Sequence, residues 1–191
     1  MSLVPAWEIG VWNVWIFIVP YLFMNFVLSP LLINRKSTFW AFPSYTRLER
    51  VNLLIGLMLM GGMWIYSIFL PLSLGTAWFY AGLFVYLLGW AFLVLSMLVF
   101  IANPVDKPNT TGVYRVSRHP WYMGMFMIYI GTGLASSSWV YILVALLLLA
   151  TYRIAFMTPE ERMCCDRFGD TYREYMNKTS SWMGIPKAET R

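Results

Sequence analysis

The sequence predicts an all-α integral membrane protein with about five transmembrane helices, and three observations lead to this class. Of the 191 residues, 59% are hydrophobic and only 12% are charged; a soluble domain carries about twice that charge. Three long stretches contain no Asp, Glu, Lys or Arg, namely residues 9–34, 51–105 and 119–152. All Lys and Arg residues lie between or after these stretches, as in a chain that crosses a bilayer several times.

The first two charge-free stretches predict three helices. An α-helix rises about 1.5 Å per residue and a bilayer core is about 30 Å thick, so about 20 apolar residues span it. Residues 9–34 therefore predict one helix at about 9–33. The second stretch exceeds one span and is interrupted by PLSLGT at 71–76, which predicts helices at about 51–70 and 77–101.

The third stretch predicts a helical hairpin. As one straight helix, its 34 residues would be about 51 Å long. The segment GTGLASSS at 131–138 interrupts it, so we expect helices at about 121–134 and 138–157. Both ends of this hairpin return to the same side of the membrane, and whether its first arm crosses fully is left open. We expect a single membrane domain over 1–191 that ends in a cytoplasmic helical segment.

The Lys and Arg positions predict the orientation. All fourteen lie in residues 35–50, 107–118 or 153–191, which five helices place on one face. Basic loops face the cytoplasm, so we expect the N-terminus outside and the C-terminus in the cytoplasm. A bacterial or archaeal inner membrane fits this topology, and so does the endoplasmic reticulum. The basic bias explains the net charge of +5, so we expect membrane lipids and no nucleic acid as partners.

Several segments receive ordinary roles. The basic and aromatic loop 34–50 is expected to lie along the membrane interface. The N-terminus lacks the basic region of a cleavable signal peptide. Cys164 and Cys165 are adjacent, which fits neither a metal site nor an unstrained disulfide, so we expect reduced, partly buried thiols and no metal. Small-residue faces permit a homodimer, and Gly131 and Gly133 suit close helix packing.

Polar chemistry gathers in residues 103–124 and 153–178. The predicted hairpin brings both segments to one membrane face, although 41 residues separate His119, the chain's one histidine, from Glu160. The candidate site therefore combines side chains from both segments: Arg118, His119, Arg153, Glu160 and Glu161. We expect the cofactor-binding region to cover about 103–178.

Each candidate also has a structural interpretation. Arg118 suits contact with anionic headgroups, and Pro120 suits the first turn of a helix. Thr158 and Glu161 have the spacing of a capping box. Tyr172 and Tyr175, three residues apart, suit coverage of the interface.

Together the candidates suit an amphoteric, cationic cofactor. Backbone N–H groups after His119 can hold a carboxylate or phosphate, and an ionised Glu160 accepts hydrogen bonds from an ammonium group or ribose hydroxyls. The rings of Tyr114, Trp121 and Tyr122 offer faces to a cationic centre. These features fit S-adenosyl-L-methionine, and they also fit a nucleotide such as NADPH.

The stretch GVYRVSRHPWYMG at 112–124, followed by EERMCCDRFGDTYREYMNKTSSWMGIP at 160–186, resembles the signature of the isoprenylcysteine carboxyl methyltransferase family. These integral membrane enzymes use S-adenosylmethionine and are related to phospholipid N-methyltransferases. The resemblance covers about residues 110–186, and the first three helices match only as generic apolar spans. It implies methyl transfer to a lipophilic acceptor, either a small apolar molecule or a lipid-modified one.

The resemblance also implies roles for individual residues. The expected cofactor-binding residues are Tyr114, Arg118, His119, Pro120, Trp121, Tyr122, Glu160 and Glu161. In the family an arginine shortly before the acidic pair faces the substrate, whereas here Phe156 takes the aligned place. Arg153 lies about one helical turn earlier, so Arg153 and His119 are the candidate catalytic residues. A carboxylate or thiolate acceptor needs no base, while an amine or phenol needs His119 or a tyrosine to remove a proton.

Two other functions remain open at this point. Membrane sterol reductases carry a similar C-terminal pattern and bind NADPH there, although they are usually longer. A membrane scaffold or transport subunit is the other alternative. Transporters usually place ionisable groups at mid-membrane depth, whereas the charges here lie at helix ends.

Overall fold

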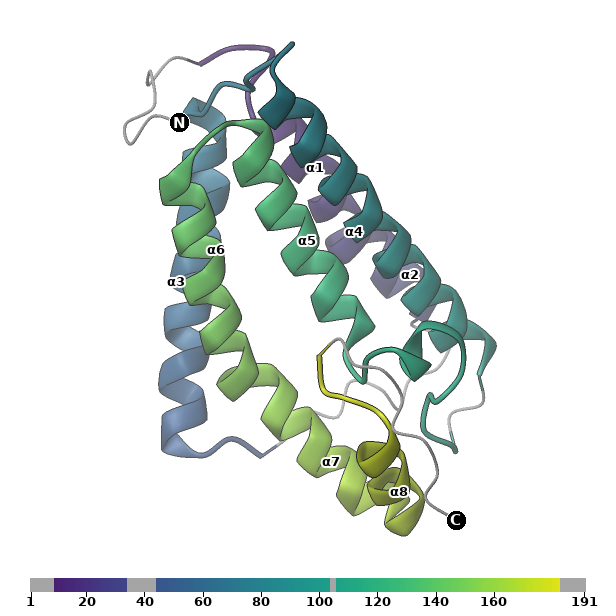
Figure 1. The fold of residues 1–191 in the computed structure, drawn as a ribbon. Coiled ribbons are helices and arrows are strands. Elements are labelled where there is room, and N and C mark those ends of the chain that lie inside the picture. The colour runs from purple at the N-terminus through teal and green to yellow at the C-terminus, as the bar shows by residue number, and fades with distance from the viewer. Residues whose placement is uncertain (1–8, 34–43, 104–105, 183–191) are drawn as a thin grey trace.

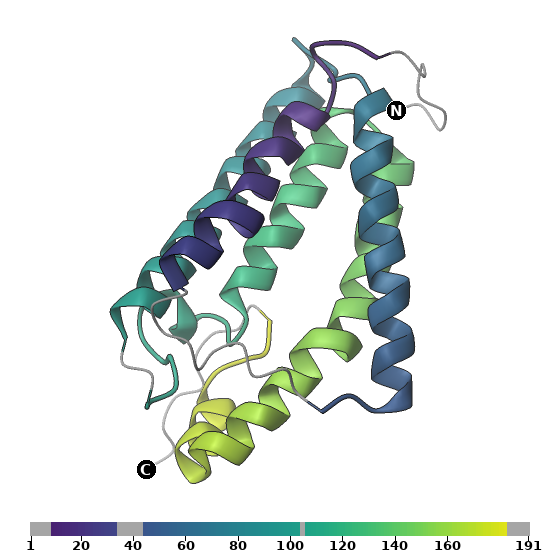
Figure 2. The ribbon, with the colours of Figure 1, turned by 180° about the vertical axis from the view of Figure 1, so that it is seen from behind.

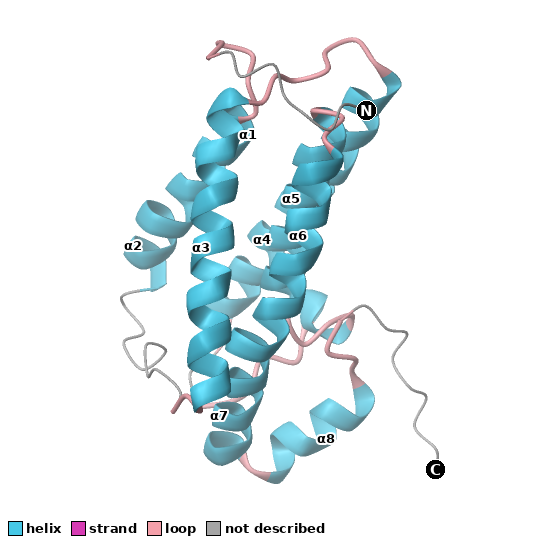
Figure 3. Cartoon of the chain, turned by 90° about the vertical axis from the view of Figure 1, so that its left-hand side faces the viewer, coloured by secondary structure: helices cyan, strands magenta, loops and turns pink. Residues whose placement is uncertain are grey.

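The computed structural model describes residues 9–33, 44–103 and 106–182, which fold into a bundle of helices (Figures 1 and 3). This confirms the all-α class. The α-helices are α1 (Trp15–Phe23), α2 (Ser29–Ile33), α3 (Arg47–Phe69), α4 (Ala77–Ala102), α5 (Pro120–Ala135), α6 (Trp139–Tyr152), α7 (Thr158–Phe168) and α8 (Asp170–Lys178). Two π-helical turns, η1 (Met24–Leu28) and η3 (Arg153–Met157), and a 3₁₀ turn, η2 (Gly112–Arg115), complete the element order.

Within the described residues, four helices are long and apolar enough to cross a membrane, whereas five were expected. They run over Trp15–Leu32, Arg47–Phe69, Ala77–Ala102 and Trp139–Phe168. The expected helix at about 121–134 corresponds to α5, which has 16 residues, or about 24 Å. It lies inside the bundle beside α4 (Figure 1), and most of its side chains are buried. A helix covered by its neighbours is in contact with little lipid along its length.

The first helix begins later than the expected residue 9. Residues 9–14 instead pack against the connection between α3 and α4. Val14 N donates to Leu70 O over 2.8 Å, and Leu72 N donates to Trp12 O over 2.9 Å. These interactions between distant segments outweigh the helical preference of an apolar stretch, because they satisfy the backbone at the end of the bundle.

The last long helix continues beyond the expected end at 157. It runs from α6 through η3 into α7 and ends at Phe168. The capping-box prediction is therefore wrong: Thr158 lies inside the helix, and its hydroxyl donates to Arg153 O over 2.9 Å. The capping-box pattern gave a wrong prediction because a continuous helix has no free N–H groups at this position for Thr158 or Glu161 to cap.

Both π-helical turns precede a proline by the same spacing. Pro30 follows η1, and Pro159 follows η3, each two residues after the turn ends. A proline ring clashes with the carbonyl four residues earlier, which here belongs to Phe26 and Ala155, the middle residue of each π turn. The wider turn accommodates the ring, so the helix continues past the proline with its later residues rotated.

Helices α4 and α5 pack with their backbones in close contact. A Cβ added to Gly82 would lie 2.2 Å from Ala135 N, and one added to Gly131 would lie 2.5 Å from Tyr86 N. Gly131 thus has the packing role that its sequence predicts. Gly133 also lies against its neighbour, since an added Cβ would lie 2.6 Å from Ile142 Cγ1.

One end of the bundle carries the start of α3, residues 106–119, α7 and α8 (Figures 1 and 2). We call it the basic end, because the described parts of all three basic segments lie there. Gly169, with φ of +57°, forms the turn between α7 and α8, a conformation that glycine adopts without strain. The prediction for loop 34–50 falls mostly on residues 34–43, outside the described residues.

Candidate functional site

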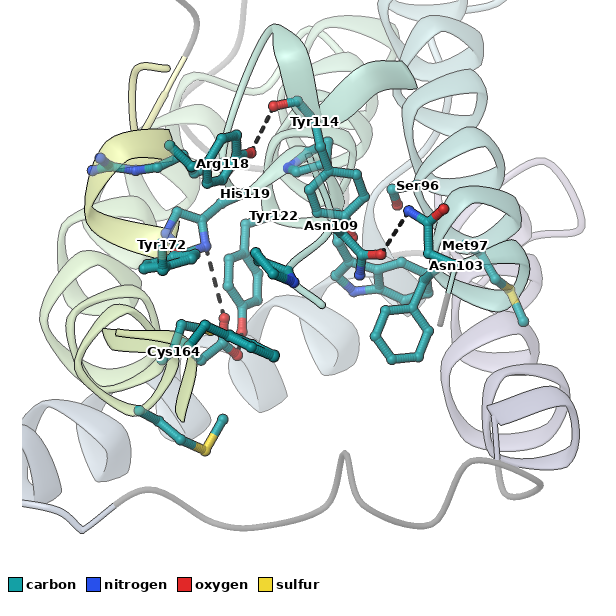
Figure 4. Close-up of a pocket in the computed structure, with 18 of the residues that line it drawn as sticks. Ser96, Met97, Asn103, Asn109, Tyr114, Arg118, His119, Tyr122, Cys164 and Tyr172 are labelled. Carbon is teal, nitrogen blue, oxygen red and sulfur yellow. Dashed lines mark hydrogen bonds and ion pairs between the residues drawn. The ribbon is translucent and has the colours of Figure 1, made fainter. Parts of the chain in front are cut away.

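A cavity of about 340 Å³ opens at the basic end, within the size range of small-molecule sites. Its walls come from η1 and α2, from α4, the segment 106–119 and the first turn of α5, and from the pair α7–α8 (Figure 4 shows part of them). Seven of the predicted cofactor-binding residues line it together: Tyr114, Arg118, His119, Pro120, Trp121, Tyr122 and Glu160. Glu161 and Arg153, the other two predicted site residues, do not line this cavity.

The start of α5 positions His119. Pro120 is the first residue of this helix, as its sequence predicts, and His119 is the N-cap residue whose side chain does not cap the helix. His119 N donates to Ser117 Oγ over 3.0 Å, and Ser117 Oγ donates to Ser181 O over 3.2 Å. These bonds fix the backbone while the imidazole turns toward α7.

Glu160 presents its carboxylate to the cavity. The Tyr122 hydroxyl donates to Glu160 Oε1, and His119 Nδ1 lies 3.7 Å from Glu160 Oε2. The Glu160 side chain is 36% exposed, so part of the carboxylate remains accessible to a ligand. Tyr122 packs in turn against rings from α6 and η3: its ring centroid lies 5.7 Å from that of Tyr152 and 6.2 Å from that of Phe156.

Glu161, in α7, connects this helix to the two residues that precede α5, Arg118 and His119. Its Oε1 lies 2.9 Å from Arg118 Nη2 and 3.0 Å from His119 Nε2, and it accepts from Ser181 Oγ over 3.1 Å. The side chains are 14% exposed in Glu161, 10% in Arg118 and 5% in His119. A carboxylate that accepts from this many donors is ionised and holds them in place.

Arg118 is more than a headgroup contact. Besides its ion pair with Glu161, its Nη1 donates to Met176 O over 3.0 Å. Its Nε is buried and has no hydrogen-bond partner within the described part of the chain. Arg118 also lines the cavity, so the guanidinium held by Glu161 and Met176 forms part of its wall.

Three tyrosines, Tyr114, Tyr172 and Tyr175, form part of the cavity wall. The Tyr175 hydroxyl donates to Tyr114 O over 2.6 Å, which joins α8 to the segment 106–119. Burial raises the pKa of Tyr114, Tyr172 and Tyr175, so these phenols are neutral at physiological pH. Tyr172 and Tyr175 line the cavity, and their interpretation as interface coverage is replaced by a place in the site.

Arg153 lies outside the cavity. Its side chain is exposed, and its Nη1 donates to Ser181 Oγ. Phe156, at the place of the family's substrate-facing arginine, stacks on Tyr152 with ring centroids 4.4 Å apart. Cys164 lines the cavity, and both cysteines are free and half-buried, as expected.

Sequence reasoning missed several residues of this region. Asn25, Ser29 and Ser96 line the cavity from the first helix and α4, but each is an isolated polar residue in an apolar stretch. An ion pair between Glu49 and Arg162, with N–O distances of 3.0 and 3.1 Å, joins the start of α3 to α7. These two positions are 113 residues apart in the chain, and no local sequence pattern connects them.

Comparison with known proteins gives two matches. A family model described as phospholipid methyltransferase matches residues 51–171, more than half of the chain. Protein-S-isoprenylcysteine O-methyltransferase from Schizosaccharomyces pombe is 36% identical over 77 residues, which are 40% of this chain and 32% of that protein. The aligned segment thus spans about a third of the relative's length. No solved structure matches the chain significantly.

Proposed function

The chain belongs to the phospholipid methyltransferase family, and on this premise we propose that it is a membrane enzyme that transfers a methyl group from S-adenosyl-L-methionine to a lipophilic acceptor. The observation that carries the proposal is the cavity at the basic end. There the first turn of α5 and the first turn of α7 bring His119, Tyr122 and Glu160 together. Neither matched description names a reductase or a transporter.

The residues of the cavity fit the proposed cofactor. Glu160 keeps an accessible edge that suits an ammonium group or ribose hydroxyls. Arg118, which lines the cavity, and the N-terminus of α5 suit a carboxylate. The aromatic rings of Tyr114, Trp121 and Tyr122 line the same cavity and suit a sulfonium or an adenine ring.

We assign Glu161 a positioning role instead of a contact with the cofactor. It does not line the cavity, and its carboxylate binds the side chains of Arg118 and His119. Its carboxylate therefore sets the orientation of two side chains that do line the cavity. Within the described residues, Arg153 is connected to Glu161 through Ser181, which accepts from Arg153 and donates to Glu161.

The chemistry is mainly a matter of positioning. S-adenosylmethionine supplies a methyl group on a sulfonium, which the acceptor attacks in line with the departing sulfur. His119 has a carboxylate oxygen near each ring nitrogen, at 3.0 and 3.7 Å, so it is engaged and poorly placed to remove a proton from an acceptor. This arrangement favours an acceptor that arrives ionised or unprotonated.

The acceptor and the topology complete the proposal. The relative's name refers to an isoprenylcysteine O-methyltransferase, which favours an acceptor with a lipid-like part that enters from the membrane. The cofactor enters at the basic end, which we place in the cytoplasm because basic segments flank the helices there.

The test is calorimetric binding of S-adenosylhomocysteine to the detergent-purified protein, with NADPH titrated in parallel. We expect S-adenosylhomocysteine to bind, and its affinity to fall at least about tenfold in Glu160→Ala and in His119→Ala, because each variant loses hydrogen bonds to a charged group. Glu174→Ala, in α8 and outside the cavity, is the matched control. Binding of NADPH alone would move the protein to the reductases, and binding of neither ligand would refute the proposal.

A further inference from the structure

The cavity extends between the membrane helices as well as toward the basic end. Asn25 and Ser29 line it from the first helix, and Ser96 lines it from α4 (Figure 4 shows Ser96). Ser96 lies six residues before the end of α4, about 9 Å along the helix. These three residues are uncharged and polar, and they lie within candidate membrane spans.

The first membrane helix, which runs from α1 through η1 into α2, contains a π turn at this part of the cavity. Asn25 belongs to η1, and Ser29 is four residues later, directly before Pro30. Residues four apart lie on one face of a helix, and π turns are frequent at functional sites. The other π turn, η3, has the same spacing to its proline and ends three residues before Glu160. Asn25 of η1 and Glu160, shortly after η3, both line the cavity.

The side chains of Asn25 and Ser96 offer hydrogen-bond acceptors to the cavity. Asn25 Nδ2 donates to Tyr21 O over 2.8 Å, which leaves its Oδ1 available. Ser96 uses its only O–H on Leu93 O over 2.9 Å, which leaves its lone pairs. Ser29 is 8% exposed and lines the cavity. The same part of the cavity is lined by Met97 and Phe100.

We infer that Asn25, Ser29 and Ser96 form a binding subsite for the lipophilic acceptor, which recognises a neutral hydrogen-bond donor, an O–H or N–H group. Neutral acceptor oxygens beside apolar side chains leave a charged group poorly solvated, whereas they pair well with a hydroxyl or an amide N–H. The inference rests on the proposed function, because it assigns this end of the cavity to the acceptor and the basic end to the cofactor.

The experiment compares farnesol with farnesyl methyl ether, two probes that differ in one O–H group. Their binding is measured by calorimetry with S-adenosylhomocysteine at saturation. We expect the wild-type protein to prefer farnesol about three- to tenfold, the effect of one or two neutral hydrogen bonds. Asn25→Leu and Ser96→Ala should each remove most of this preference while the affinity for the ether is retained, which also shows that the variants are folded.

Two matched variants control for the change of residue type. Asn52 donates to Leu48 O, four residues back, as Asn25 does to Tyr21 O. Ser67 is 1% exposed and donates to Trp64 O, three residues back, as Ser96 does to Leu93 O. Neither control lines this cavity, so Asn52→Leu and Ser67→Ala should keep the preference for farnesol.

Three results would overturn the inference. One is a wild-type protein that does not prefer farnesol, including one that binds neither probe. Another is a preference that survives in the Asn25→Leu and Ser96→Ala double variant. The third is a loss of S-adenosylhomocysteine affinity in these variants, which would assign this end of the cavity to the cofactor. Failure of the wild type to bind S-adenosylhomocysteine refutes the proposed function instead, and the two probes are then compared on the protein alone.

Discussion

Helix α5 meets α4 and α7 through two different kinds of contact. Toward α4 the contact is steric: a Cβ on Gly82 would lie 2.2 Å from Ala135 N, so the helices approach because side chains are missing. Toward α7 the contact is electrostatic, since Arg118 and His119 both reach Glu161 Oε1. One contact depends on the absence of atoms, and the other depends on the presence of all its partners.

This difference predicts a rigid contact between α4 and α5 and a contact between α5 and α7 that can change when a ligand binds. Close packing of backbones tolerates almost no displacement, because repulsion rises steeply at short distance. A buried carboxylate with several donors is costly to leave partly paired, and its neighbours line the cofactor cavity. Ligand binding is therefore expected to act on the α5–α7 contact and to leave the α4–α5 contact unchanged.

The largest effect is expected from filling the steric contact. In Gly82→Ala the new Cβ meets backbone atoms that cannot move aside, so we expect a loss of at least about 3 kcal/mol and a lower yield of monodisperse protein. The measurement is thermal unfolding in detergent. Gly61→Ala, in α3 with nothing within 4 Å of an added Cβ, should be neutral or stabilising. Equal stability of the two variants would contradict the close α4–α5 contact.

A smaller effect is expected from breaking the electrostatic contact. Glu161→Gln keeps the shape but leaves the Arg118 guanidinium without its counter-charge and weakens the contact with His119 Nε2, so we expect a loss of about 2 kcal/mol and weaker binding of S-adenosylhomocysteine. Asp170→Asn removes the carboxylate of an exposed pair with Arg173, where the side chains are 89% and 66% exposed. That control should change stability by less than about 1 kcal/mol. If both variants behave alike, Glu161 does not organise the site.

The smallest effect is expected from Arg153→Gln. The side chain is exposed and loses one hydrogen bond to Ser181, so stability should change by less than about 1 kcal/mol. The affinity for S-adenosylhomocysteine should change less than about twofold, because Arg153 does not line the cavity. A large rise of KM for an acceptor at unchanged cofactor affinity would show instead that Arg153 faces the substrate.

Sequence reasoning succeeded where the signal is local. Pro120 predicts a helix start because its missing N–H costs nothing in the first turn, and the structure confirms it. The hairpin predicts that His119 and Glu160 share one end of the bundle, because two antiparallel helices joined by a short turn return there. Both residues line one cavity.

The same reasoning failed where a long-range contact or a change of helix phase determines where a helix ends or which side chain faces the cavity. Thr158 has a capping-box pattern, but the helix passes through it because η3 makes room for Pro159. Glu161 follows Glu160 directly, yet one lies behind His119 and the other lines the cavity. Adjacent residues on a helix point about 100° apart, and the π turn sets which of them faces inward.

The sequence by itself determined the membrane class, the order of the helices and the end at which polar chemistry gathers. These follow from the free energy of placing apolar and charged residues in hydrocarbon, which depends on residue type along the chain. The tertiary structure decided that Glu160 faces the cavity, that Arg153 does not, and that Asn25 and Ser96 do. Those outcomes depend on helix phase and on contacts between residues far apart, which composition and spacing do not encode.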